Sequence, residues 1–309
     1  MAGRYDVVVV GGGAAGFTAA LFTARDRLRT LVLERFASGG QVLNCEHIEN
    51  YPGLPDGVAG YTLGPALQQQ ANNAGAEVQM SEVTGFRLDG DDKLLDTDAG
   101  PVRARALIVA SGSRFTTLGV PGEGDFVGKG VSHCASCDGS FFMQQPVAVV
   151  GGGDAAVDEA MHLTRYASDV TVIHRRDTLR AARSLQERAR ANPRLRFRWN
   201  AAVRAIEGTD AVQRVIVEDL TTGARAPMPV SGVFIYAGLT PNTEFLGGLV
   251  PLTPGGQIVT DLEMRTTVPG VLAAGDVRAA SARLLVAAAG DGATAAMAAV
   301  RYLGSGIWR

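Results

Sequence analysis

Cysteine is scarce in this chain, which has three cysteines among 309 residues. So few thiols exclude the disulfide-dense scaffold of a small secreted protein and favour the reducing cytoplasm, where we expect this protein to work. Two of the thiols, Cys134 and Cys137, nevertheless lie close together in the segment HCASCDGSFF. In a reducing compartment such a pair is more often redox-active or metal-binding than structural.

Long apolar runs and an excess of charge of either sign are missing too. No apolar stretch reaches the ~18 residues that a membrane helix needs, so we expect no membrane span. The 29 Lys and Arg residues nearly balance the 31 Asp and Glu residues, which gives no sign of nucleic acid or an anionic membrane as a partner. The N-terminus, MAGRYDVVVVGGG, runs directly into an apolar strand and lacks the small-residue cleavage site of a signal peptide.

What the chain has in plenty is glycine, with 39 residues, and two copies of one glycine-containing pattern. Residues 5–35 and 146–176 each contain an apolar run, a glycine triplet, an amphipathic stretch of helical length and a second apolar run that ends in charge. This order predicts a strand, a tight turn, a helix and a parallel strand. The chain length also favours two domains over one.

The glycine spacing of both copies is typical of a dinucleotide-binding turn. The first glycine allows the turn, the second lets a pyrophosphate approach backbone N–H groups, and the third small residue lets the helix pack on the strand. Two purely structural turns are the alternative, but two copies inside complete strand–helix–strand units favour nucleotides. The positions are Gly11, Gly13 and Gly16 in the first copy and Gly151, Gly153 and Ala156 in the second.

The residues that end the second strand of each copy distinguish two kinds of nucleotide. Glu34 closes the first copy, and a carboxylate there accepts hydrogen bonds from ribose hydroxyls and repels a 2′-phosphate. The second copy has HRRDTLR at this place, which suits a 2′-phosphate dianion, although a solvated basic surface is the alternative. We therefore expect an unphosphorylated adenosine in one site and NADP(H) in the other. The expected donors are His174, Arg175, Arg176 and Arg180.

Later segments predict that one domain is inserted into another. Strands are expected in the segments 104–113, 231–245 and 270–277, the second of them ending at Ala237 and Gly238, and an alanine-rich helix follows the last segment. Short connections near Arg114–Val120 and Thr240–Phe245 would bracket the inserted domain. We expect an α/β fold with two Rossmann-like, three-layer ββα domains. The outer domain would span 1–115 and 245–309, and the inserted domain 116–244.

Three interpretations of Cys134 and Cys137 stay open on the residues alone. A redox dithiol fits because the spacing lets the two sulfurs reach bonding distance and one thiol is commonly acidified. A zinc site would need His133 and Cys45 as further ligands, and we expect no metal. A pair of inert buried thiols is the third interpretation. Asp138 would either supply a proton to a thiolate or cap the following segment.

With these motifs in place, the chain resembles the low-molecular-weight, bacterial-type thioredoxin reductases over nearly its full length. The segments that carry the resemblance follow the family's order: GGGAAGFTAA, SGGQVLNCEHIENYPG, CASCDG, GGGDAAVDEA, HRRDTLR and AAGDV. The family implies FAD in the outer domain, NADPH and the redox dithiol in the inserted domain, and a homodimer. It implies electron transfer from NADPH through the flavin and the Cys134–Cys137 dithiol to the disulfide of thioredoxin or a thioredoxin-like protein.

The resemblance also implies the site residues. The catalytic residues would be Cys134, Cys137 and Asp138, with Cys134 as the more outward thiol that attacks the partner and Cys137 nearer the flavin. FAD contacts are implied at Gly11, Gly13, Glu34, Gln41, Asn50 and Asp276, and NADPH contacts at Gly153, Asp154, His174, Arg175, Arg176 and Arg180. Further cofactor contacts are expected at Ala14, Ala15, Gly40, Val83, Ala110, Gly112, Ala155, Gly238 and Gly275. The two connections would form a hinge that presents either NADPH or the dithiol to the flavin.

The chain departs from the family's pattern in four places. Ala14 replaces the usual proline, and Ser136 replaces the threonine of the common Cys-Ala-Thr-Cys loop. Leu284 stands where a glutamine near the flavin is expected, and Cys45 lies where we expect no cysteine. Leu284 leaves open a reductase or dithiol oxidase that acts on another protein or a small-molecule disulfide. A non-enzymatic FAD-binding sensor is a further alternative, although an intact HRRDTLR segment argues against it.

Overall fold

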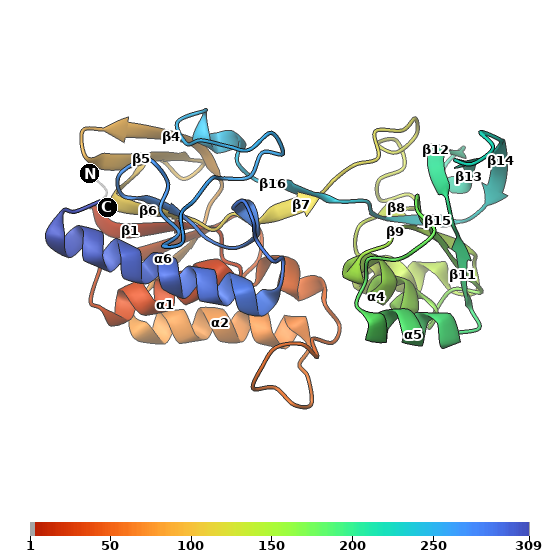
Figure 1. The fold of residues 1–309 in the computed structure, drawn as a ribbon, viewed down its shortest axis with the longest axis horizontal. Helices are drawn as coiled ribbons and strands as arrows, with labels where there is room; N and C mark the ends of the chain where they lie inside the picture. Colours follow the sequence, from red (N-terminus) through yellow and green to blue (C-terminus); the bar gives the residue numbers. More distant parts are fainter. Residues whose placement is uncertain (1–3, 309) are drawn as a thin grey trace. The chain divides into compact units, whose positions relative to one another are not determined.

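The computed structural model describes residues 4–308, and the chain forms two compact units (Figure 1). The first unit contains both ends of the chain, Met1–Arg114 and Thr240–Arg309, and the second contains Phe115–Leu239. The predicted domain borders lay at 115/116 and 244/245. Which cofactor each unit holds stays a prediction.

The first unit is built on a seven-stranded sheet with the order β3-β2-β1-β6-β5-β4, in which β17 also pairs with β6. The strands β1, β2, β3, β6 and β17 run parallel, and the β4–β5 hairpin is antiparallel. The strands are β1 Tyr5–Val10, β2 Thr30–Glu34, β3 Glu77–Met80, β4 Val83–Asp89, β5 Asp92–Thr97, β6 Val102–Val109 and β17 Val271–Ala273. The helices are α1 Ala14–Arg25, α2 Gly60–Ala74 and α6 Leu285–Ser305.

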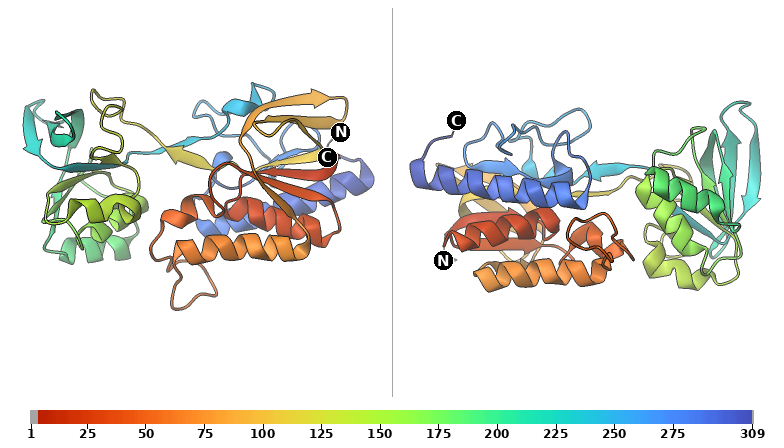
Figure 2. Two further views of the ribbon diagram at one scale, coloured as in Figure 1. Left: turned by 180° about the vertical axis from the view of Figure 1, so that it is seen from behind. Right: turned by 60° about the horizontal axis from the view of Figure 1, so that its bottom comes forward.

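The apolar run of β1 is buried on both faces of this sheet. Val7 and Val9 pack toward the three helices, whereas Val8 and Val10 pack in a second cluster with residues of the β4–β5 hairpin. Figure 2 shows the helices together on one side of the sheet. A Cβ atom on Gly292 of α6 would overlap the carbonyl oxygen of Ala15, so this glycine lets α6 lie directly against α1. These contacts fix the first glycine turn between the sheet and two helices.

The second unit repeats the arrangement with a five-stranded parallel sheet of order β11-β10-β9-β15-β8. One face packs on helices α4 and α5, and the other face packs on the antiparallel sheet β12-β13-β14. This unit is therefore a three-layer ββα domain. Its strands are β8 Val131–Ser132, β9 Val147–Gly151, β10 Val170–Ile173, β11 Leu195–Arg198, β12 Ala201–Gly208, β13 Val212–Asp219, β14 Arg225–Pro229 and β15 Gly232–Tyr236. Its helices are α3 Ala135–Asp138, α4 Asp154–Leu163 and α5 Arg183–Ala191.

The two segments at which the chain passes between the units pair with each other. They are β7 Ser113–Phe115 and β16 Leu239–Pro241, which form a two-stranded sheet. The N–H of Thr116 donates to the carbonyl oxygen of Gly238 at 2.9 Å and continues this pairing. Short 3-10 helices lie at Gly40–Asn44, Gly139–Phe142, Glu244–Leu246 and Gly275–Val277.

The predicted fold class is confirmed. Both repeat copies fold as strand, turn, helix and parallel strand. In the segment 231–245, β15 ends at Tyr236, next to the predicted strand end at Ala237 and Gly238, and Gly238, with a φ of 149°, separates β15 from β16. None of the helices in residues 4–308 is long and apolar enough to cross a membrane.

Candidate active site and nucleotide sites

The two close thiols form a disulfide in the second unit. Cys134 and Cys137 are bonded, with their Cα atoms 5.3 Å apart. Cys134 is the N-cap of the short helix α3, and its sulfur accepts a hydrogen bond from the N–H of Cys137 at 3.2 Å. No group of three or more His, Cys, Asp or Glu side chains in residues 4–308 is arranged to hold a metal ion. The disulfide bond itself fits the redox interpretation of the pair.

The two sulfurs differ in their surroundings. Cys134 is partly buried within its unit and Cys137 is exposed, so the expectation that Cys134 is the more outward thiol is wrong in this structure. The hydroxyl of Ser136 lies 3.4 Å from the Cys134 sulfur, which has no proton in the disulfide and can only accept. Two donors, the Ser136 hydroxyl and the Cys137 N–H, thus point at Cys134. Such donors would stabilise a thiolate at Cys134 after reduction.

Asp138 follows the dithiol, and its side chain does not cap the next segment. It is the N-cap of the 3-10 helix Gly139–Phe142, but its side chain makes no capping hydrogen bond. Its Oδ2 instead accepts from the Ser132 hydroxyl at 2.6 Å. Asp138 also lines a pocket of about 350 Å³ together with Phe141. The carboxyl is held beside the dithiol, as an acid that serves the thiols would require.

Two residues of the dithiol site were not anticipated from the sequence, Glu159 on α4 and Tyr236 on β15. The N–H of Ala135, the residue after Cys134, donates to Glu159 Oε2 at 2.9 Å and lies 3.2 Å from the Tyr236 hydroxyl. Burial raises the pKa of Glu159 to about 7, and burial together with the Glu159 charge raises the pKa of Tyr236. The only sequence signal that could have identified Glu159 was its place next to Ala160, a buried residue of an amphipathic helix.

This raised pKa predicts a pH-dependent stability difference between the wild type and Glu159→Gln. From about pH 4.5 to 7 the unfolded state loses the Glu159 proton while the folded state keeps it, so the wild type loses stability as pH rises. Glutamine resembles the protonated carboxyl and cannot titrate. We expect the stability of Glu159→Gln relative to wild type to increase by ~1–3 kcal/mol from pH 5 to pH 8. Urea unfolding at both pH values measures the difference, and a constant difference would contradict a raised pKa.

The first glycine turn brings most of the predicted FAD residues together. A Cβ on Gly11 would overlap the carbonyl oxygen of Ala110, and one on Gly16 would overlap the carbonyl oxygen of Gly11. Glu34 is buried at the end of β2, and its Oε2 accepts from the N–H of Gly12 at 2.7 Å. The turn, the acid and the end of β6 therefore meet at the carboxyl edge of the sheet, where such folds bind ligands.

Other predicted FAD residues border this turn, whereas two do not. A Cβ on Gly40 would lie 3.5 Å from the Cα of Gly13, and one on Gly275 would lie 3.0 Å from the Cβ of Ala15. Gln41 donates to the carbonyl oxygen of Ser113 at 2.6 Å, next to Gly112. Among residues 4–308, the contacts that border the turn do not include two of the predicted residues. They are Asn50, exposed in a loop, and Val83, at the start of β4.

Asp276 lies in a loop that α6 fixes in place. Burial raises the pKa of its carboxyl, whose Oδ1 accepts from the Ser281 hydroxyl at 3.0 Å. The buried Asp291 of α6 pairs with Arg278 at 2.6 and 2.8 Å and accepts from the N–H of Gly275 at 3.1 Å. A two-point carboxylate–guanidinium pair of this kind holds one geometry, so the Gly275–Asp276 backbone is fixed beside the first glycine turn.

These residues fit an FAD adenosine and pyrophosphate. Helix α1 begins after Gly13 without a side-chain cap and without an acid in its first turn, which leaves N–H groups for an anion. The glycines border a space where a Cβ would collide with backbone, and Glu34 offers a carboxylate at the strand end. This is the donor and acceptor set that a dinucleotide without a 2′-phosphate requires.

Gly16→Ala is expected to disrupt this turn. Its Cβ would meet the Gly11 backbone, which cannot rotate away as a side chain can, so α1 and the turn must separate. We expect a loss of ~1–3 kcal/mol in stability and weaker FAD retention, measured by thermal unfolding and by the flavin absorbance of the purified protein. Gly304→Ala on α6 is the control, because nothing lies within 4 Å of that Cβ. Equal behaviour of the two variants would contradict the prediction.

The second glycine turn is tied to the basic segment by backbone hydrogen bonds. The carbonyl oxygen of Gly152 accepts from the N–H of Arg180 at 2.7 Å, and Asp154 Oδ1 accepts from the N–H of Ala182 at 2.7 Å. Gly153 is the N-cap of α4, and Ala155 lies in the first turn of that helix. The predicted NADPH residues of the turn and the basic segment are therefore neighbours.

His174 and the three predicted arginines differ in exposure. His174 is 5% exposed, packs against Gly152, and has no hydrogen-bond partner for Nε2 among residues 4–308. Burial and the nearby arginines lower its pKa, which favours the neutral ring. Arg175, Arg176 and Arg180 are exposed beside the turn. An orphaned buried ring nitrogen and three exposed guanidinium groups fit a phosphorylated ribose.

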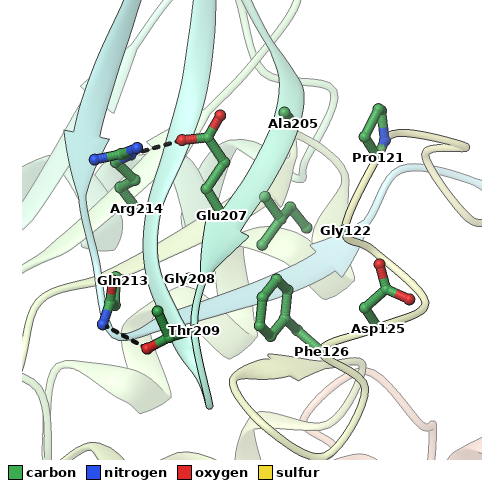
Figure 3. Close-up of a pocket in the computed structure, with 11 residues that line it drawn as sticks. Pro121, Gly122, Asp125, Phe126, Ala205, Glu207, Gly208, Thr209, Gln213 and Arg214 are labelled. Atoms are coloured by element: carbon green, nitrogen blue, oxygen red, sulfur yellow. Dashed lines mark hydrogen bonds and ion pairs between the residues drawn. The ribbon is translucent and has the colours of Figure 1, made fainter.

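One groove of the second unit lies apart from all of these residues. It has a volume of about 600 Å³ and lies between β12, β13 and the loop that contains Phe126 (Figure 3). Arg214 pairs with Glu207 at 2.6 Å along its wall, and the Gln213 amide donates to Thr209 at 3.2 Å. None of the predicted site residues lines it, so it is not the candidate active site.

Comparisons with known proteins agree with this arrangement. The pattern of the pyridine nucleotide-disulphide oxidoreductase family matches residues 5–292. The thioredoxin reductase of Treponema pallidum is 43% identical over 302 residues, 97% of each chain. That of Listeria innocua is 45% identical over 301 residues, 97% of this chain and 94% of that protein. The crystal structure of Lactococcus lactis thioredoxin reductase has a TM-score of 0.95 at 41% identity and covers 97% of this chain and 99% of that one.

These likenesses confirm the predicted resemblance, enzyme class and cofactor pair. The chain is a disulfide oxidoreductase of a family that uses FAD and NADPH, and the residues at its two glycine turns fit those cofactors. The alternative functions left open by Leu284 are not favoured. The chain belongs to the pyridine nucleotide-disulphide oxidoreductase family and, within it, to the low-molecular-weight thioredoxin reductases.

Proposed function

We propose that this protein reduces the disulfide of thioredoxin or of a thioredoxin-like protein with electrons from NADPH. The observation that carries the proposal is the Cys134–Cys137 disulfide in the unit that also contains the HRRDTLR segment and its glycine turn. One unit thus contains a dithiol and a binding segment for a phosphorylated nucleotide, and the other contains a second dinucleotide turn. Together they supply both ends of an electron path.

Each cofactor would be held by residues that the fold brings together. The turn at Gly11 and Gly13, with Glu34 and Asp276, would hold FAD, which when bound passes two electrons between a nicotinamide and a disulfide. The turn at Gly153, with Arg175, Arg176 and Arg180, would hold NADPH. The exposed guanidinium groups would select the 2′-phosphate over a free hydroxyl, since such contacts are charge-assisted and two-pronged.

Once the dithiol is reduced, the protein's own residues carry out the exchange. The Cys134 thiolate attacks one sulfur of the partner disulfide, so that a mixed disulfide forms and the partner's other sulfur leaves as a thiolate. The Ser136 hydroxyl and the Cys137 N–H lower the cost of negative charge on Cys134. Cys137 then attacks the Cys134 sulfur, which restores the internal disulfide and releases the reduced partner. The Asp138 carboxyl, which the Ser132 hydroxyl holds beside these sulfurs, is placed to relay protons from water to the departing thiolates.

The partner and the assembly are part of the same proposal. Phe141, four residues after Cys137, is 74% exposed and gives the dithiol segment an apolar neighbour that a protein partner would cover. We propose that the protein acts as a homodimer in the cytoplasm. Leu284, 43% exposed at the N-cap of α6, replaces an amide by an apolar side chain without disturbing the helix start. That the two connections act as a hinge stays a prediction.

A substrate panel tests the proposed function. The purified protein, loaded with FAD, is mixed with NADPH and with each thioredoxin-like protein of the source organism or with small-molecule disulfides. We expect NADPH oxidation to be fast with at least one thioredoxin-like protein and at least tenfold slower with the small disulfides. Faster turnover with a small disulfide than with every protein would overturn the proposal and favour the small-molecule alternative.

A further inference from the structure

Glu159 and Tyr236 both contact the dithiol segment, residues 134–138. Neither is required for the electron path proposed above. Glu159 belongs to α4, and Tyr236 projects from β15 on the helix-covered face of the sheet. Both reach the N–H of Ala135, at 2.9 and 3.2 Å. Ala135 is fully buried and lies between the two cysteines.

The N–H groups of Ala135, Cys137 and Asp138 differ in whether their hydrogen bonds depend on the position of Cys134. The N–H of Cys137 donates to the Cys134 sulfur and the N–H of Asp138 to the Cys134 carbonyl oxygen, so both depend on where Cys134 lies. The N–H of Ala135 instead donates to side chains of two other elements. When the disulfide opens and Cys134 bonds to a partner, this anchor is independent of the sulfurs. It can hold the segment in both redox states.

The neighbouring rings and charges keep the anchor in one geometry. The Phe115 ring packs edge-on against Tyr236 at 5.1 Å and stacks on His133 at 5.9 Å, and His133 Nδ1 lies 2.9 Å from the carbonyl oxygen of Ile235. The other charged groups that act on the pair are Asp158, on the same helix as Glu159, and Asp138, on α3. Tyr236 is 7% exposed, so its hydroxyl has little freedom to exchange this contact for water.

We propose that Glu159, assisted by Tyr236, is a positioning residue that keeps the two thiols close in the reduced enzyme and thereby favours the disulfide over the dithiol. A held segment raises the effective concentration of one thiol at the other, which promotes disulfide closure and release of the partner. Loosening the segment leaves the disulfide bond itself unchanged but makes closure less probable. The dithiol then becomes the easier state to reach, and the reduction potential rises.

The inference rests on the redox role proposed for the dithiol, and its test reads the dithiol without thioredoxin or NADPH. Full-length protein with FAD is equilibrated in buffers of fixed reduced-to-oxidised glutathione ratio. Free thiols are then alkylated, and the fraction of dithiol is measured by mass spectrometry of the Cys134–Cys137 peptide. A wrong partner assignment would leave this measurement intact, and an unchanged potential would leave the substrate panel intact.

The expected results separate positioning from charge. Glu159→Ala removes the acceptor and should change the dithiol–disulfide equilibrium constant about tenfold toward the dithiol, a rise of about 30 mV. Glu159→Gln keeps a carbonyl acceptor for the Ala135 N–H and should remain within about threefold of the wild type. Tyr236→Phe removes one hydroxyl and should change the constant about two- to threefold in the same direction. The control Glu207→Ala removes an exposed carboxylate paired with Arg214 and should change nothing.

Two outcomes would overturn the proposal. If Glu159→Ala leaves the equilibrium constant within twofold of the wild type, the contact does not position the dithiol. If Glu159→Gln moves it as far as Glu159→Ala, charge and not the hydrogen bond sets the potential. Should Glu159→Ala fail to fold, as judged by circular dichroism, Tyr236→Phe decides alone, and an unchanged constant in that variant rejects the inference.

Discussion

Cys134→Ser and Cys137→Ser should each abolish reduction of a protein disulfide, with a loss of at least ~10³-fold in kcat/KM. A single remaining thiol cannot complete the exchange, because the internal disulfide cannot reform and release the partner. Reduction of bound FAD by NADPH should survive in both variants, since the sulfurs act only after that step. Anaerobic absorbance at the flavin band measures the surviving step, and NADPH oxidation with a thioredoxin-like protein measures the lost one.

The two serine variants should not behave alike. In the structure the Cys134 sulfur has two donors directed at it, the Ser136 hydroxyl and the Cys137 N–H, which favour a thiolate there. Cys137→Ser should therefore accumulate a mixed disulfide with the partner through Cys134, visible on a non-reducing gel. Cys134→Ser should not. Accumulation only in Cys134→Ser would reverse the assigned roles of the two thiols.

Cys45→Ser is the matched control for these variants. Cys45 is the remaining cysteine and lies in the first unit, outside the disulfide. We expect turnover within about threefold of the wild type, a change in barrier below ~1 kcal/mol. If Cys45→Ser is as damaging as the other two, a third thiol takes part, and the two-thiol exchange described here is wrong.

The features that the sequence predicted well are those with a strong local pattern. Each glycine turn needs particular small residues, and an apolar run such as Tyr5–Val10 is long and uninterrupted, so both repeat copies could be placed. Glu34 could be placed because strand ends in this fold lie at one edge of the sheet. The Cys-x-x-Cys spacing allowed a redox dithiol as one of three interpretations, and the structure contains the disulfide.

The features that the sequence did not predict depend on contacts between distant segments. Glu159 lies 24 residues from Ala135, and Tyr236 lies 101 residues from it, so no local pattern joins them. The relative exposure of Cys134 and Cys137 also depends on what packs around α3 and not on their spacing.

Replacing Arg175 and Arg176 together by alanine should raise the apparent KM for NADPH by ~100-fold or more and should hardly change that for NADH. Both side chains are exposed beside the second glycine turn, which the Gly152–Arg180 hydrogen bond holds against the basic segment. Each guanidinium–phosphate contact contributes ~1.5–3 kcal/mol, so losing two contacts costs ~3–6 kcal/mol of binding. NADH lacks the 2′-phosphate and should not gain from these groups. Initial rates over a range of both nucleotides measure the split.

A double variant with the same change in charge separates specific contacts from the general field of the unit. Arg188→Ala with Arg190→Ala removes two positive charges from the last turn of α5 in the same unit. Long-range attraction would fall equally in both double variants, and salt would weaken it in both. Direct contacts to a phosphate would be lost only with Arg175 and Arg176, because their segment is the one tied to the glycine turn. Equal increases in KM for NADPH and NADH in the Arg175–Arg176 variant, or equal effects of the two double variants, would remove the basis for placing the 2′-phosphate there.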